Sequence, residues 1–135
     1  MDLDRALTIS AAGMAAQSTR LRVVAENISN RDSTGQQPGA EPYRRKTVNF
    51  GSRVDRNLGA ETVRVSRIGR DQAAFPERFE PNHPAADARG YVRTPNVDSM
   101  VENMDMREAN RSYSANLAVL ETTRGMLMRA IETLR

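Results

Sequence analysis

Few residues of this chain have types and spacings suited to chemistry, and His83 is the first to consider. It is the only histidine and lies in residues 81–84 (PNHP), with Glu80 and Asp87 as the nearest carboxylates. Acid–base catalysis or metal binding needs partners that converge on the imidazole, and these carboxylates have no established ligand spacing. Two neighbouring prolines favour a rigid turn. We therefore interpret His83 as structural, with a small hydrolase centred on it as an alternative.

The basic triplet Arg44-Arg45-Lys46 is the second candidate, because short basic clusters can bind phosphate groups. The net charge of +3 is mild, and the triplet has neither interleaved aromatic residues nor a recognition-helix pattern. A solvated strand face explains it more simply. A small basic coiled-coil protein that binds nucleic acid stays as the alternative function.

The remaining residue types exclude most catalytic machinery. The chain has no cysteine, which rules out disulfides, thiolate metal sites and cysteine nucleophiles. Its glycines form no phosphate-binding loop, and no serine has a histidine close in sequence. We therefore expect a protein that is not an enzyme and that uses no cofactor, metal ion or small-molecule substrate.

Length and composition indicate one elongated domain or a domain completed by partners. The chain has 135 residues, of which 39% are hydrophobic and only 4% aromatic, which is little for a compact core around a pocket. Residues 1–4 (MDLD) are acidic where a signal peptide is basic, and no run approaches the roughly 18 apolar residues of a membrane helix. We expect neither a cleaved signal peptide nor membrane insertion.

Proline and glycine divide the chain into three segments. Residues 31–96 hold all six prolines and six of the eight glycines, whereas residues 1–30 and residues 97–135 have no proline and one glycine each. These two residue types mark loops and break helices. The division predicts an N-terminal helix, an extended irregular middle and a C-terminal helix.

In the first segment, apolar residues recur at the heptad spacing of a coiled-coil seam, which a few polar residues interrupt. Small side chains in the same helix would let another helix approach closely, which offers a reason for a glycine inside a helix. The predicted seam residues are Leu7, Met14, Leu21, Val24 and Ile28, and the close-packing residues are Ser10, Ala11, Ala12, Gly13 and Ala16.

The last segment repeats this pattern, and Asn96 or Asp98 is a natural N-cap for its helix. Its predicted seam residues are Met106, Tyr113, Leu117, Leu120, Leu127, Ile131 and Leu134. Each terminal helix thus has an apolar stripe that it cannot bury alone, so we predict that the two pair as an antiparallel coiled coil. In the middle, residues 43–50 and 62–68 are expected to form a short β-hairpin, and residues 91–93 could pair. The predicted fold is mainly α with a small β part.

Sequence motifs extend over nearly the whole chain. They are residues 9–17 (ISAAGMAAQ), 25–30 (AENISN), 42–46 (PYRRK), 81–87 (PNHPAAD), 90–92 (GYV), 95–97 (PNV) and 109–116 (ANRSYSAN). In this combination the chain resembles the bacterial flagellar rod and hook proteins, and within them the proteins of the proximal rod. Asn82 and Ala85 depart from the family pattern, where glycine and an acidic residue are more usual, and this affects only a local turn.

The resemblance implies a structural subunit of the flagellar basal body that polymerises into the proximal rod. That rod is a drive shaft that spans the periplasm, transmits torque, encloses the export channel and is needed for motility. The implied partners are copies of the chain itself, rod proteins of the FlgB, FlgF and FlgG types, the rod-base adaptor FliE, the membrane-embedded ring and the export apparatus. The implied route is flagellar type III secretion without a cleaved signal.

These features suggest how the chain assembles. An open helical polymer needs heterologous contacts, and we expect the terminal helices to be poorly ordered in the monomer and to become ordered on assembly. Asn27, Asn30 and Asn116 would give directional hydrogen bonds between helices or, equally, be exposed polar positions. We expect aromatic residues of the middle segment to anchor an outer layer of contacts. The motif and interface candidates are Asn27, Asn30, Tyr43, Arg44, Arg45, Phe50, Phe79, Pro81, His83, Pro84, Tyr91, Pro95, Asn96 and Asn116.

Overall fold

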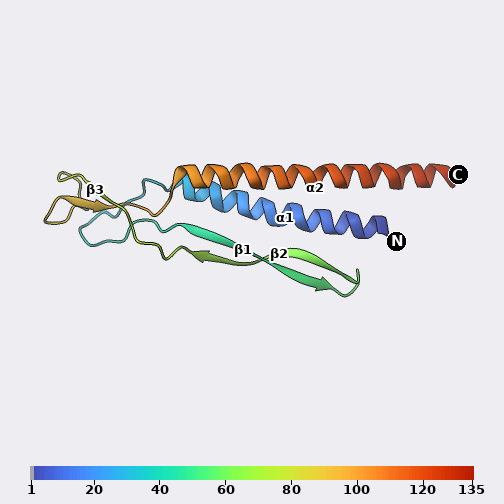
Figure 1. Ribbon diagram of the computed structural model, residues 1–135, viewed down its shortest axis with the longest axis horizontal. Helices are drawn as coiled ribbons and strands as arrows, with labels where there is room; N and C mark the ends of the chain where they lie inside the picture. Colours follow the sequence, from blue (N-terminus) through green and yellow to red (C-terminus); the bar gives the residue numbers. More distant parts are fainter. Residues whose placement is uncertain (1) are drawn as a thin grey trace.

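A computed structural model describes residues 2–135 and shows an elongated molecule in which two long helices lie above a β-hairpin (Figure 1). Met1, the first residue of the predicted segment 1–30, lies outside the described residues. The mainly α character with a small β part is confirmed. In chain order the elements are α1 (Asp2–Ser29), β1 (Lys46–Asp55), β2 (Ala60–Arg70), β3 (Glu77–Phe79), β4 (Tyr91–Arg93) and α2 (Ser99–Thr133).

Local chemistry sets the ends of both helices. Asp2 and Asp4 lie in the first turn of α1, where negative charge stabilises the helix dipole. At the end of α1, the backbone and the side chain of Asn30 both donate to the carbonyl of Glu26. Asp98 caps α2, since its carboxylate accepts from the backbone N–H of Met100 at 2.9 Å. Asp98 was one of the two predicted caps.

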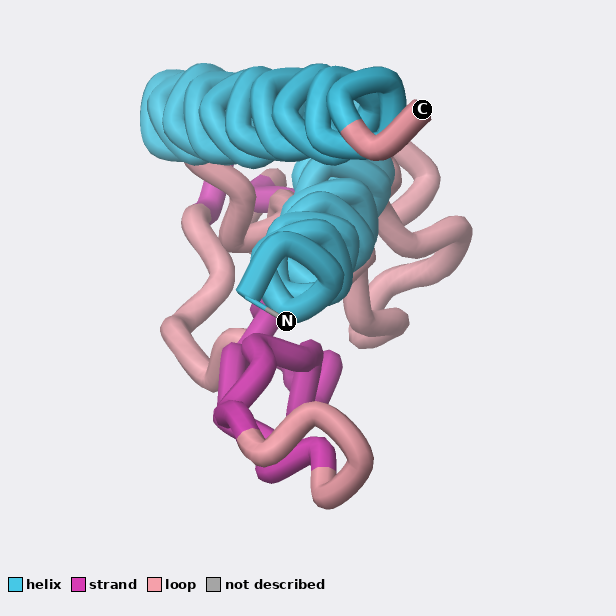
Figure 2. Tube along the Cα trace, turned by 90° about the vertical axis from the view of Figure 1, so that its right-hand side faces the viewer, coloured by secondary structure: helices cyan, strands magenta, loops and turns pink. Residues whose placement is uncertain are grey.

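The two helices run in opposite directions. Gly13 of α1 lies against Asn116 of α2, and Arg20 and Asn27 of α1 contact Asp105 and Glu102 of α2 respectively, so the order of contacts reverses. The helices are close together at the end of α1 and diverge toward its start (Figures 1 and 2). The C-terminal half of α2 is therefore left largely uncovered within the chain.

Small and polar side chains form the seam between the helices. On α2 the buried residues are Glu102, Ala109 and Thr123, and on α1 they include Gly13 and Ala16. A Cβ atom at Gly13 would lie 2.8 Å from the side-chain nitrogen of Asn116, so glycine is what permits this approach. Of the predicted small residues, Ser10, Gly13 and Ala16 are buried, Ala12 is half-buried and Ala11 is exposed.

The predicted apolar stripes are covered only in part within the chain. Leu117 and Ile131 are exposed, and Leu134 is 87% exposed. Ile131 and Leu134 are exposed because they lie in the half of α2 that α1 leaves largely uncovered. Val24 is buried, and the half-buried members of the stripes are Leu7, Met14, Leu21, Ile28, Met106, Tyr113, Leu120 and Leu127.

The hairpin of β1 and β2 lies on the side of α1 away from α2, as the views in Figures 1 and 2 agree. The strands pair antiparallel, with an irregularity in register between Asn49 and Phe50. At the tip, Arg5 of α1 donates to the carbonyls of Leu58 and Gly59 at 2.6 and 3.3 Å. The predicted hairpin is confirmed, but its strands are longer toward the tip, and β1 begins at Lys46 rather than at residue 43.

The second sheet is a short pairing of β3 with β4. The predicted run at residues 91–93 is confirmed as a strand, whereas its partner β3 was not predicted. The rings of Phe79 and Tyr91 meet edge to face with centroids 5.3 Å apart. Gly90, which precedes Tyr91, has φ +84°, and a Cβ there would lie 2.9 Å from the Phe79 ring. Both conditions require glycine.

Asp87 accepts hydrogen bonds from the turn before β4, and we expect acid to destabilise this turn. The backbone N–H of Tyr91, followed by contacts from Arg89, lowers the pKa of Asp87 below its ordinary value of 3.8. A lowered folded-state pKa adds stability that is present above the ordinary value and lost as pH falls through the folded value. A carboxyl NMR titration should give a midpoint below 3.8. A midpoint at or above it, or a turn whose acid response is the same in Asp87→Asn, contradicts this.

Candidate functional site

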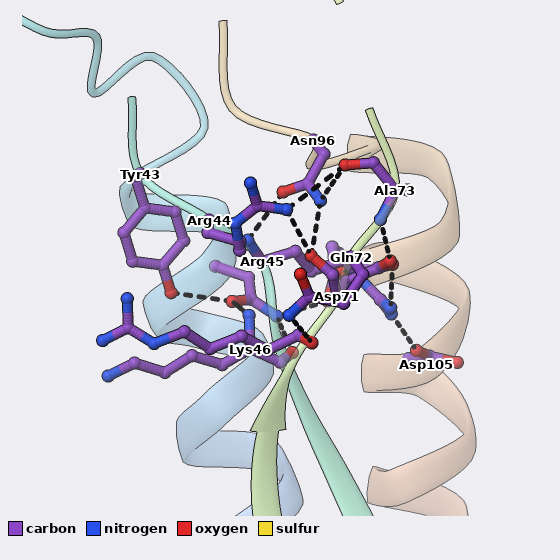
Figure 3. A network of polar contacts seen from close by, with 12 residues as sticks. Tyr43, Arg44, Arg45, Lys46, Asp71, Gln72, Ala73, Asn96 and Asp105 are labelled. Carbon is purple, nitrogen blue, oxygen red and sulfur yellow. Dashed lines mark hydrogen bonds and ion pairs between the residues drawn. The ribbon is translucent and has the colours of Figure 1, made fainter. Parts of the chain in front are cut away.

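A cluster of hydrogen-bonded and charged side chains lies where the chain leaves α1, enters and leaves the hairpin, and enters α2 (Figure 3). We call it the polar joint. Four chain segments that are far apart in sequence contribute to it. Its residues are Asn27, Tyr43, Arg44, Arg45, Lys46, Asp71, Asn96, Glu102 and Asp105.

Glu102 lies at the centre of the polar joint. Its side chain is 0% exposed, in the first turns of α2. One carboxylate oxygen forms an ion pair with Nε of Arg45, and the other accepts from the Asn27 amide at 3.3 Å. A buried carboxylate is tolerated only when it is paired and hydrogen-bonded, and both conditions hold here.

Arg45 connects Glu102 to two further carboxylates. Its terminal nitrogens lie 3.4 Å from Asp71, just after β2, and 3.3 Å from Asp105 on α2. Burial by itself would lower the pKa of Arg45, but the hydrogen bond and charge of Glu102, together with Asp105 and Asp71, raise it above its ordinary value. Arg45 therefore stays charged and links three segments through one guanidinium.

Asn27 uses its whole amide. Its nitrogen donates to the carbonyl of Lys46 at 2.9 Å and to Glu102, and its oxygen accepts from the Tyr43 hydroxyl at 2.8 Å and the Lys46 N–H at 2.9 Å. Burial, then the charges of Glu26 and Glu102, raise the pKa of Tyr43. The phenol thus remains a proton donor. Asn27 fastens the start of β1 to the last turn of α1.

Asn96 and Arg44 close the other side of the polar joint. The Asn96 side chain accepts from the backbone N–H of Arg45 at 2.8 Å and donates to the carbonyls of Asp71 and Ala73. Arg44 donates to the Asp71 carbonyl at 2.9 Å and stacks 4.2 Å from the Phe75 ring. These contacts tie the chain entering the hairpin to the chain leaving it.

The polar joint corrects the interpretation of the basic triplet as a solvated strand face, because its three side chains are half-buried. Arg44 and Arg45 contact the segment after β2, and Lys46 forms an ion pair with Glu26 of α1. All three cations thus have partners within the chain. Because internal carboxylates and carbonyls already occupy them, the nucleic-acid alternative is not supported.

His83 is placed as the structural interpretation expects. Its Nδ1 accepts from the backbone N–H of Ala85 at 3.0 Å, and its Nε2 lies 3.1 Å from the Thr34 hydroxyl. The tautomer with its proton on Nε2 makes both contacts. The imidazole therefore ties the loop before β4 to the loop after α1. Across residues 2–135, no group of three metal-ligating side chains converges.

The three asparagines differ from one another. Asn27 bonds across to α2, as predicted for a directional contact between helices. Asn30 donates within its own helix end, and Asn116 donates to the carbonyl of Ser112 at 3.0 Å while packing against Gly13. For these two the predicted hydrogen bond between helices is not what the structure shows.

Of the remaining motif and interface candidates, Tyr43 and Asn96 belong to the polar joint, and the aromatic residues and prolines named below lie outside it. Phe50, Phe79 and Tyr91 are exposed and thus accessible to a neighbour, as an anchor must be. Pro95 is buried, whereas Pro81 and Pro84 are exposed.

Sequence reasoning missed the acidic half of the polar joint, Glu102, Asp71 and Asp105. A usable signal was present on α2, where Glu102, Ala109, Asn116 and Thr123 recur at heptad positions. That stripe of small and polar residues is the true inner face, and it was passed over because it is not apolar.

A hollow of about 340 Å³ adjoins the polar joint, between α1, β1 and α2. Its lining residues include Arg20, Val23 and Val24 of α1 and Asp105 of α2.

No helix within residues 2–135 is long and apolar enough to cross a membrane.

Comparisons with known proteins point to one family. Residues 88–133 match the family model of the flagellar basal body rod FlgEFG protein C-terminal region. The flagellar basal-body rod protein FlgC of Agrobacterium fabrum is 50% identical, over 98% of this chain and 96% of the relative. FlgC of Salmonella typhimurium is 43% identical over 91% of each chain, and FlgC of Bacillus subtilis is 38% identical over 93% of this chain and 94% of the relative.

Proposed function

Because this chain belongs to the FlgC family of flagellar basal-body rod proteins, we propose that it polymerises into the proximal part of the rod and is needed for motility. The chain is a structural subunit of the flagellar basal-body rod. The proposal concerns its place there. It forms part of the drive shaft that transmits torque and encloses the export channel, and it catalyses no reaction.

The observation that carries this proposal is the apolar surface that α2 leaves uncovered. The exposed residues lie in the first turns of the helix and along its C-terminal half, which is more apolar surface than a chain that acts alone in water usually presents. They are Met100, Val101, Met104, Leu117, Val119, Met126, Met128, Ile131 and Leu134. Neighbouring subunits would cover this surface in a polymer.

In this proposal the helices pair as an antiparallel coiled coil and line the inner tube. Heterologous contacts between copies build an open helical assembly. The hairpin and the β3–β4 region form the outer contacts, with the exposed rings of Phe50, Phe79 and Tyr91 as anchors. The neighbours are copies of the chain, proteins of the FlgB, FlgF, FlgG and FliE types, the membrane-embedded ring and the export apparatus. The chain reaches the periplasmic space through flagellar type III export.

Circular dichroism with sedimentation tests coupled folding and assembly. The purified chain is measured alone and then mixed with each rod protein. We expect low helicity alone, and a gain of both helix and mass on mixing, because the exposed apolar residues of α2 need a neighbour to be buried. A stably helical monomer that binds none of them contradicts the proposed mechanism.

Helix-breaking substitutions test the paired helices in the cell. Leu21→Pro or Leu120→Pro should abolish rod assembly, since proline inside a helix costs about 3 kcal/mol or more. Leu21→Ala and Leu120→Ala are the matched controls, because they shorten the same side chains and keep the helix. Rods are counted in isolated basal bodies. Normal rods from either proline variant would refute the paired-helix arrangement.

A further inference from the structure

We propose that Glu102 is a positioning residue that sets the direction in which the β1–β2 hairpin leaves the helix pair. The consequence for assembly rests on the proposed function, in which the hairpin of each copy meets a neighbour. The positioning itself concerns only contacts within the chain. Glu102 lies on α2, and it reaches the hairpin through Arg45 and α1 through Asn27.

The two oxygens of Glu102 hold two different elements. Oε1 pairs with Arg45, the residue that immediately precedes β1, and Oε2 accepts from Asn27 in the last turns of α1. Asn27 in turn holds both backbone groups of Lys46, the first residue of β1. The base of the hairpin is therefore attached to both helices through one carboxylate.

Beyond its base the hairpin lies along α1, and β2 makes most of these contacts. Toward the tip, its contact with α1 includes the pair of hydrogen bonds from Arg5 to the carbonyls of Leu58 and Gly59. The apolar side chains Val54 and Val63 are exposed instead of packing on α1. A two-stranded hairpin with so little buried apolar surface is weakly stabilised by itself. The charged contacts at its base therefore add a restraint on its direction that the exposed apolar side chains do not supply.

Burial distinguishes Glu102 from the other acids of the polar joint. The side chains of Asp71 and Asp105 are 31% and 30% exposed, so water can replace Arg45 for them. Glu102 is 0% exposed. A rotation of the hairpin that withdrew Arg45 would leave a buried carboxylate without a cation, which is strongly unfavourable. The charge of Glu102 therefore opposes other hairpin directions.

In a rod, each hairpin must meet its neighbour at the same place in every copy. A base that resists rotation gives each subunit the same outline without a large apolar contact between hairpin and helices. The exposed valines of the hairpin then remain available to the neighbour. Glu102 thus sets the geometry of assembly without touching another subunit.

Distance measurements by electron spin resonance test this inference. The chain has no cysteine, so introduced cysteines are unique labelling sites. One pair of labels, at Asn57→Cys and Glu121→Cys, measures the distance from the hairpin tip to α2. A second pair, at Ser18→Cys and Arg111→Cys, measures the distance between the two helices. All four positions are exposed. Rods are assembled with a minority of labelled chain, so that distances within one copy dominate.

Two variants probe the contact from either side. Glu102→Gln keeps the shape but has only one acceptor oxygen, so Arg45 or Asn27 loses its partner. Arg45→Lys keeps the charge but cannot contact three carboxylates at once. Glu108→Gln is the control, because that acid pairs with Arg20 and its side chain is 68% exposed.

In both variants we expect the distribution of tip-to-α2 distances to broaden by about twofold or more, because the buried charge restrains the hairpin. The distribution of helix-to-helix distances should stay unchanged. Glu108→Gln should resemble the parent in both. Unchanged tip distances in Glu102→Gln and Arg45→Lys would overturn the inference. So would equal broadening of both pairs, or chains too unstable to enter rods, since Glu102 would then only stabilise the fold. Failure of the parent chain to enter rods would contradict the proposed function instead.

Discussion

Replacing Arg45 by alanine should lower the free energy of unfolding by about 3–5 kcal/mol, because it leaves a buried carboxylate without its cation. Glu102 has no access to water that could take the place of the guanidinium. The same change removes the attachments of Asp71 and Asp105. We expect the variant to be nearly absent from isolated basal bodies and the cells not to swim.

The measurements are the amount of the chain in isolated basal bodies and the diameter of swimming halos. Arg31→Ala is the matched control, since its pair with Asp32 is exposed and contributes at most about 0.5 kcal/mol. Combining Arg45→Leu with Glu102→Leu should recover much of the loss, because two apolar residues can replace a buried ion pair. If Arg45→Ala behaves like Arg31→Ala, the polar joint does not stabilise the fold.

Replacing Gly13 by leucine should separate the two helices. A Cβ at this position would lie 2.8 Å from Nδ2 and 3.0 Å from Cγ of Asn116, and leucine adds three more carbons in the same direction. Overpacking of this kind costs about 1–3 kcal/mol. We expect fewer rods, with the effect visible in the helix-to-helix spin-label distance.

Smaller changes at the same contact give the control. Gly13→Ala gains about 1 kcal/mol of helix propensity, which the displacement of Asn116 opposes. With Asn116→Ala in the background, the displacement disappears and Gly13→Ala should become stabilising. A Gly13→Leu chain that assembles like the parent would mean that the helices do not approach closely in the rod.

Local sequence signals predicted the secondary structure well. Asp98 is a good N-cap, the prolines are confined to residues 31–96, and alternation at residues 62–68 indicates a strand, so the elements were recognisable. The bounds of β1 were less so. The polar groups of residues 43–45 bond to Ser33, Asn96 and the segment after β2 rather than to a strand partner.

The inner face of the helix pair was harder to predict. Heptad reasoning chose Leu117, Ile131 and Leu134 because apolar residues usually form a seam, yet these side chains are exposed. The helices instead approach through Gly13, Ala16 and Ala109. In a subunit that assembles, some apolar residues of a helix pack within the chain and others pack against neighbouring subunits. The heptad spacing of the apolar residues in one chain does not distinguish these two sets.

By itself the sequence determined the chain's helices, its hairpin, its lack of cysteine chemistry and, through its motifs, its family. These depend on residues near one another in the chain, where propensity, capping and turn chemistry act. Tertiary structure alone decided what the motif residues do. Arg45 meets Glu102 across 57 positions and Asn27 meets Glu102 across 75, and no local rule links such residues. Burial then makes the difference, because it turns an ordinary acid on α2 into a charge whose partners must be in place.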